Sequence, residues 1–277
     1  MKKTLMILSA VVALAACSSD ESEKDVAQPA EVTLKFSPYE VESMTRAAVA
    51  DFASRLDVWI YEDGVEMHTV HQQATDDGYA TLTVTLDKTK MYTLYAVAHN
   101  CNGAANLADG VVSFPDDKVS QSFFYTTTFT PATSTSLNCV MNRIVGMFRI
   151  ETTDAKPDDT SAIRLTIYQT GNRWNVGGTS ANVTDRVATV NLTSTHSDGT
   201  VAVSVYVMPD NMTDTKDVDI LVETLKSDDI VKDSWTFNDV PIRAGYKTTY
   251  RGTLFVGTPT TATFAVSDWN EFNVVNF

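Results

Sequence analysis

Apolar and polar residues alternate from Glu31 onward, and this period of two constrains the fold more than any other feature of the chain. Side chains that alternate in this way lie on opposite faces of a β-strand, whereas a helix shows a period near 3.6. No stretch carries a helical stripe of twelve residues, although residues 45–53 could form a turn or two of helix or an extended loop. The chain is therefore predicted to be all-β.

Val, Thr, Tyr and Phe are used heavily, and turn-forming residues arrive about every eight to twelve positions. The Asp63-Gly64 pair predicts a tight hairpin, since this pair readily adopts positive φ values. Strands are expected at residues 32–36, 55–61, 79–86, 92–98, 122–129, 144–151, 163–169, 186–192, 201–208, 217–223, 234–237, 247–255 and 263–266. Many short strands favour antiparallel β-sandwiches over a parallel sheet, which would need long crossover helices.

The length and composition favour two such sandwiches in tandem. The chain has 277 residues, of which 43% are hydrophobic, so it can bury substantial cores. About thirteen strands are more than one small sandwich packs easily. We expect an N-terminal sandwich domain at residues 31–140 and a C-terminal one at residues 141–277.

The first residues have the layout of a secretory signal peptide. Lys2 and Lys3 precede an apolar stretch at residues 5–13, which is too short to span a bilayer. The following Leu14-Ala15-Ala16-Cys17 resembles the bacterial lipobox, which predicts a signal peptide at residues 1–16 and a lipid, such as palmitate, on Cys17. The alternative is an ordinary cleaved signal with Cys17 near the cut.

Residues 17–30 are polar and acidic and are predicted to form a disordered tether. This tether resembles the signal that sends some lipoproteins to the outer face of the outer membrane; the alternative is a solvated linker. The expected location is the cell surface, with the lipid on Cys17 in the outer membrane. The formal net charge of −14 opposes binding to nucleic acids and to anionic headgroups.

Two cysteines remain besides Cys17. Cys101 and Cys139 could form a disulfide in an oxidising compartment. They could equally be two buried free thiols, because the sequence gives no distance between them.

The sequence carries no catalytic signature. It has no Gly-x-Ser-x-Gly, His-Glu-x-x-His, Cys-x-x-Cys or phosphate-loop motif, so we expect neither an enzyme nor a cofactor. His68 and His71 are three residues apart, which turns them to opposite faces of a strand and argues against a metal site. Paired aspartates lie at turn positions, and the four tryptophans are isolated along the chain, as core residues are.

Several segments, in this order, resemble the fimbrillin and fimbrial-anchor superfamily of type V pili. They are the lipobox, Thr45-Arg46-Ala47, residues 55–61 with their Asp-Gly turn, and residues 92–100, 141–150 and 242–255, closing toward Trp269. The resemblance implies two β-sandwich domains, export as a lipoprotein and incorporation into a surface fimbria, with other fimbrial subunits as partners in a homo- or heteropolymer.

In polymerising members of that superfamily, a trypsin-like protease cuts after an arginine and removes the lipidated segment with a first strand. The resemblance places this cut between Arg46 and Ala47, so the strand at residues 32–36 would be lost and a strand from another subunit could replace it. Arg46 could instead lie in a loop that is never cut. Only residues 270–277 follow Trp269, which also fits a lipid-retaining anchor or a minor or tip subunit. A surface lipoprotein that binds glycan or host protein without polymerising is a further alternative.

Overall fold

The computed structural model describes residues 27–39, 49–132, 134–193, 195–256 and 263–268. Their regular secondary structure consists of β-strands and two short 3₁₀ turns, η1 (Val49–Asp51) and η2 (Pro115–Asp117). The predicted all-β fold is confirmed. Within the described ranges, no helix is long and apolar enough to cross a membrane.

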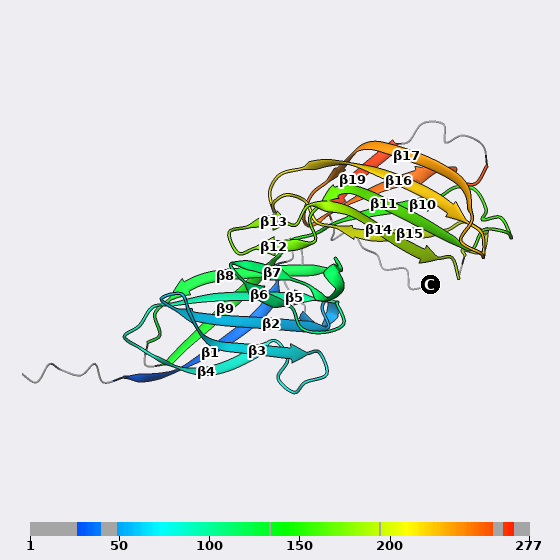
Figure 1. Cartoon of the computed structure of the whole chain (residues 1–277). Coiled ribbons are helices and arrows are strands. Elements are labelled where there is room, and N and C mark those ends of the chain that lie inside the picture. The colour runs from blue at the N-terminus through cyan, green and yellow to red at the C-terminus, as the bar shows by residue number, and fades with distance from the viewer. Residues whose placement is uncertain (1–26, 40–48, 133, 194, 257–262, 269–277) are drawn as a thin grey trace, which may run out of the picture.

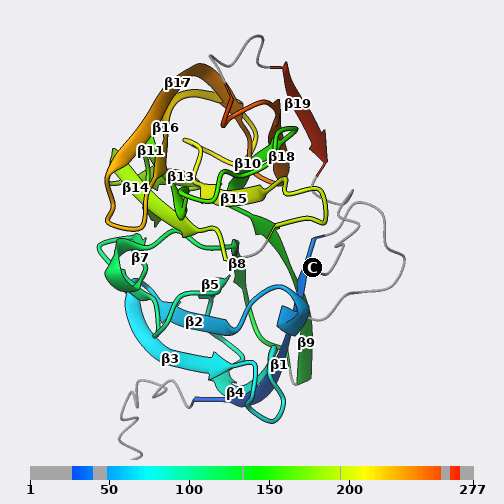
Figure 2. The same ribbon diagram turned by 90° about the vertical axis from the view of Figure 1, so that its right-hand side faces the viewer.

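Seven strands build the first sandwich, in the order β3-β2-β5-β8-β9-β1-β4 (Figures 1 and 2). They are β1 (Pro29–Pro38), β2 (Arg55–Glu62), β3 (Val65–Gln73), β4 (Thr81–Asp87), β5 (Tyr92–His99), β8 (Ser122–Phe129) and β9 (Ser134–Arg143). β8 and β9 pair through only two residues each, so the sheet is nearly divided there. One core contains side chains from β1, β4 and β9 together with side chains from β2 and β5, and we call it the first core.

The predicted hairpin is confirmed between β2 and β3. Asp63 has a φ of 48° and Gly64 a φ of 81°, the positive values that a two-residue turn of this kind requires. β3 and β9 were not among the expected strands. The domain boundary expected between residues 140 and 141 lies inside β9.

The second sandwich has two sheets of four strands, β15-β10-β18-β19 and β14-β11-β16-β17. They comprise β10 (Gly146–Thr152), β11 (Ala162–Thr170), β14 (Thr184–Asn191), β15 (Ala202–Val207), β16 (Lys216–Leu225), β17 (Val231–Ile242), β18 (Tyr246–Gly252) and β19 (Thr263–Asp268). Phe148, Ile163 and Tyr250 are among the buried side chains of the core of this sandwich, which we call the second core. Alternating burial along β10 and β15 matches the period of two in the sequence.

Two strand pairs depart from the antiparallel arrangement that the sequence suggested. β1 pairs with β9 in parallel, and β10 pairs with β18 in parallel. In each pair the two strands are far apart in the sequence, so the intervening strands provide the return path that a crossover helix provides in an α/β sheet.

A small sheet that the sequence did not predict joins the two halves of the chain. We call it the joining layer; its order is β13-β12-β7-β6, from β6 (Asn106–Ala108), β7 (Val111–Ser113), β12 (Arg173–Asn175) and β13 (Thr179–Ala181). β7 pairs antiparallel with β12, so a hairpin of each half contributes to one sheet (Figure 1). A third core, which includes Trp59, Phe124 and Trp174, lies around it.

Candidate functional site

The N-terminal strand β1 lies inside the first sandwich. It pairs antiparallel with β4 on one side and parallel with β9 on the other. Ala30, Val32, Leu34 and Phe36 alternate along β1, and each is at most 6% exposed. β1 is therefore an internal strand with a complete set of neighbours, although it belongs to the first described segment of the chain.

The pairing of β4 depends on β1. β4 is the last strand of the sheet order, and β1 is its neighbour there. Without β1, the backbone N–H and C=O groups on that side of β4 and on the facing side of β9 would lose their partners. The apolar side chains of the first core that β1 covers would also become exposed to water.

The expected protease cleavage site, between Arg46 and Ala47, follows β1 in the sequence. The described chain stops at Tyr39, whose N–H donates to the carbonyl oxygen of Met141, and resumes at Val49 in η1. Arg46 and Ala47 lie outside the described residues, as does Cys17.

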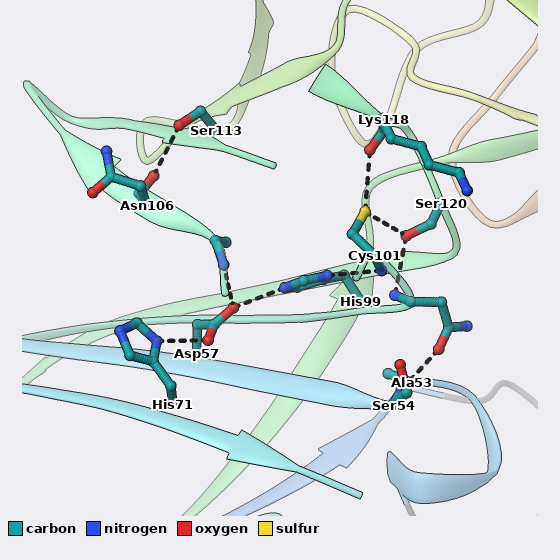
Figure 3. Close-up of polar contacts among 12 residues, drawn as sticks. Ala53, Ser54, Asp57, His71, His99, Cys101, Asn106, Ser113, Lys118 and Ser120 are labelled. Atoms are coloured by element: carbon teal, nitrogen blue, oxygen red, sulfur yellow. Dashed lines mark hydrogen bonds and ion pairs between the residues drawn. The ribbon is translucent and has the colours of Figure 1, made fainter. Parts of the chain in front are cut away.

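A buried carboxylate on β2 of the same sandwich forms the second candidate site (Figure 3). Asp57 of β2 is fully buried, and its two oxygens accept three hydrogen bonds. The donors are Nδ1 of His71 at 2.7 Å, Nε2 of His99 at 2.7 Å and the backbone N–H of Ala105 at 2.8 Å. A buried carboxylate needs such partners, because an unpaired one would lose its hydration without compensation.

The hydrogen bonds of His99 use both nitrogens of its ring. Nε2 donates to Asp57, and Nδ1 accepts the backbone N–H of Cys101 at 3.1 Å, so the ring is neutral in this arrangement. Burial, the largest single effect, lowers the pKa of His99, but the interactions of the ring with Asp57 and Cys101 together outweigh burial and raise that pKa above its ordinary value.

This network lacks the geometry of nucleophilic catalysis. The thiol of Cys101 contacts the carbonyl oxygen of Lys118 at 3.2 Å and Oγ of Ser120 at 3.3 Å. Neither nitrogen of His99 is left to take its proton, and Cys101 is only 2% exposed. Among the described residues, no three His, Cys, Asp or Glu side chains are placed to hold a metal ion. The hydrogen bonds of Asp57 with His71 and His99 instead connect β2 to its neighbouring strands β3 and β5.

The two remaining cysteines are not bonded to each other. Both thiols are free and buried, Cys139 in the first core and Cys101 in the core around the joining layer. Of the two alternatives that the sequence left open, the disulfide is absent because the two side chains pack in different cores. Burial raises the pKa of the Cys139 thiol to about 12.

The tryptophans and histidines that the sequence analysis singled out contribute to packing and pairing within the fold where the structure describes them. Trp59 and Trp174 are buried and Trp235 packs against the second core, so these three are core residues as predicted; Trp269 lies outside the described residues. His71 joins the Asp57 network, whereas His68 lies opposite Ile60 on the neighbouring strand.

Sequence reasoning missed Asp57 and its partners. The available signal was an acidic residue between apolar neighbours in the expected strand at residues 55–61, together with histidines on nearby strands. That signal indicates that the carboxylate of Asp57 needs hydrogen-bond donors. It does not identify them, because His99 and Ala105 are 42 and 48 residues away from Asp57 in the sequence.

Comparisons with known proteins support the fold. No protein-family model matches the chain, and no curated protein sequence matches it. Among solved structures, a candidate adhesin from Bacteroides thetaiotaomicron is similar, with 12% identity, a TM-score of 0.56, and coverage of 88% of this chain and 98% of that one.

Two further structures have a comparable extent of similarity. A candidate polysaccharide-binding protein from Bacteroides thetaiotaomicron has 10% identity and a TM-score of 0.54, with 87% of this chain and 96% of that one covered. The fimbrial anchor protein Mfa2 from Porphyromonas gingivalis has 11% identity and a TM-score of 0.51, with 87% and 98% covered. The resemblance to fimbrial proteins that the sequence suggested is thus confirmed at the level of the fold.

Proposed function

We propose that this protein is a structural component of a cell-surface fimbria, exported as a lipoprotein through Cys17 and assembled with other fimbrial subunits. The observation that carries the proposal is the position of β1. β1 lies between β4 and β9 inside its sheet, and Arg46 follows it in the sequence. A single proteolytic cut after Arg46 would therefore separate β1 from the rest of the chain that forms its sandwich. The fold shared with Mfa2 is consistent with this role.

The energetics favour replacement of β1 once it is lost. Burial of a Val, Leu or Phe side chain stabilises a fold by about 1.5–3 kcal/mol. Val32, Leu34 and Phe36 together therefore account for several kcal/mol, a large part of the ~5–15 kcal/mol that stabilises a typical domain. A cleaved subunit with an empty position between β4 and β9 would be marginally stable at best.

A strand from a second subunit can occupy that position by β-augmentation. Backbone hydrogen bonds to β4 and β9 would supply affinity, and alternate apolar side chains would fill the sites of Leu34 and its neighbours. Because such donation runs head to tail, it does not close and extends into a filament.

The experiment is proteolytic processing of the full-length precursor. A trypsin-like protease should cut after Arg46, give a new N-terminus at Ala47, and yield ladders of assembled subunits on a denaturing gel run without boiling. An Arg46→Ala precursor should stay uncut and monomeric. The control Arg55→Lys keeps a basic residue at the start of β2 and should be processed normally. An Arg46→Ala protein that assembles like the wild type would contradict processing at this site.

A lipid-retaining fimbrial anchor is the second candidate, favoured by the similarity to Mfa2, which is itself an anchor protein. In that role β1 stays in place and Cys17 keeps its lipid. The N-terminus of protein recovered from cells separates the two roles: lipidated Cys17 indicates an anchor, and Ala47 indicates a processed subunit. A monomer that keeps its N-terminus and binds a glycan array would support a non-polymerising glycan-binding lipoprotein instead.

A further inference from the structure

The joining layer makes the two sandwiches share backbone hydrogen bonds. Trp174 of β12 pairs with Val112 of β7 across the two halves. Trp174 is fully buried, and its ring centroid lies 6.4 Å from that of Phe124 in the first sandwich.

Polar contacts between the two halves reinforce this connection. Nε of Arg173 lies 3.0 Å from Oδ1 of Asp117, and a second guanidinium nitrogen lies 3.3 Å from Oδ2. The hydroxyl of Tyr206 donates to Oε1 of Gln121 at 3.2 Å. The second half is thus tied to the segment between β7 and β8 as well as to β7 itself.

The half of the joining layer that belongs to the first sandwich needs its own attachment, since β6 and β7 have only three residues each. The segment that leads from β5 to β6 is held at both ends by the buried polar network (Figure 3). Cys101 donates its N–H to His99 at the start, and Ala105 donates its N–H to Asp57 immediately before β6.

Asp57 connects three segments that are distant in the sequence. Its carboxylate holds β3 through His71, β5 through His99 and the entry to β6 through Ala105. An asparagine at this position has the same shape but only one acceptor oxygen, and its NH₂ group would face a donor. The negative charge also makes each of the three hydrogen bonds stronger than a neutral one.

We propose that Asp57 locks the joining layer onto the first sandwich and thereby fixes the orientation of the second sandwich, so that the two sandwiches behave as one rigid body. Loss of this lock should leave the first core in place, because Leu56 and Val58, which flank Asp57 on β2, belong to that core, so the side chain of Asp57 lies on the opposite face of the strand. The second core belongs to the other sandwich. The same loss loosens β6 and β7, and with them the backbone pairing of β7 to β12, while the contact of Trp174 with Phe124 remains. This role does not depend on fibre assembly.

The test compares Asp57→Asn with His71→Ala in the full-length protein. His71 contacts Asp57 from the partly exposed strand β3, so its removal deletes one hydrogen bond of the network without touching the entry to β6. In Asp57→Asn, amide hydrogen exchange in β6 and β7 should become at least about tenfold faster, with β1 and β16 unchanged. In His71→Ala, exchange in β6 and β7 should stay at the wild-type rate.

A distance measurement reports the orientation directly. Spin labels on genetically encoded ketone residues at Met67 in β3 and Val187 in β14, both exposed, avoid the native cysteines. The distance distribution should be narrow in the wild type and in His71→Ala, and broad in Asp57→Asn. A narrow distribution in Asp57→Asn, or equal effects of the two variants, would overturn the proposal.

The wild-type protein supplies an independent check if Asp57→Asn does not fold. The N–H of Ala105 must then exchange as slowly as the amides of β5, since the carboxylate protects it. Exchange of Ala105 at the rate of an exposed loop amide would also refute the lock.

Discussion

Truncation of Leu34 tests whether β1 is an integral part of the first core. Leu34 is fully buried in the middle of β1, opposite Leu82 of β4 and Leu137 of β9. Removal of a buried leucine side chain to alanine costs about 2–5 kcal/mol, and the cost is larger where the surroundings cannot collapse into the cavity. Because strands flank β1 on both sides, we expect Leu34→Ala to lower the free energy of unfolding by about 3 kcal/mol.

Urea denaturation followed by tryptophan fluorescence measures this loss, since Trp59 lies on β2 of the same sandwich. The matched control is Lys35→Ala, on the same strand but with its side chain exposed, which should change the free energy of unfolding by less than about 0.5 kcal/mol. A loss below about 1 kcal/mol for Leu34→Ala, or equal losses for the two variants, would refute the inference that β1 fills a packed position.

Three further predictions concern other parts of the fold. Asp154 accepts N–H groups from three successive residues, 254–256, at 2.6–2.9 Å, so Asp154→Ala should destabilise the second sandwich by about 2 kcal/mol and speed amide exchange there. The Cys139 thiol, with its pKa raised to about 12, should resist alkylation at pH 8 until the protein unfolds. The thiol of the unfolded chain ionises at about pH 8.5, so the free energy of unfolding should fall as the pH rises above that value. A Cβ at Gly146 would lie 2.6 Å from the carbonyl oxygen of Arg243, so Gly146→Ala should lower the melting temperature, whereas Gly177→Ala, with no atom within 4 Å, should leave it unchanged.

The sequence predicted the strands whose two faces differ strongly. β2 and β5 alternate or run apolar over eight residues, long enough to show their period, and the Asp63-Gly64 turn carries its own backbone signal. Strands of three residues show no period, which is why the joining layer was not predicted. β3 was missed because its side chains are mostly exposed and its composition is polar.

The sequence by itself determined the class of the fold, the faces of the long strands and the absence of a catalytic motif, because these depend on residues close to one another in the chain. Only the tertiary structure decided that β1 lies between β4 and β9, and that Asp57 meets His71, His99 and Ala105. Strand partners are selected by burial and hydrogen bonding between segments that are about 100 residues apart in the case of β1 and β9. A local pattern fixes which face of a strand is apolar, but it does not fix which strand will cover it.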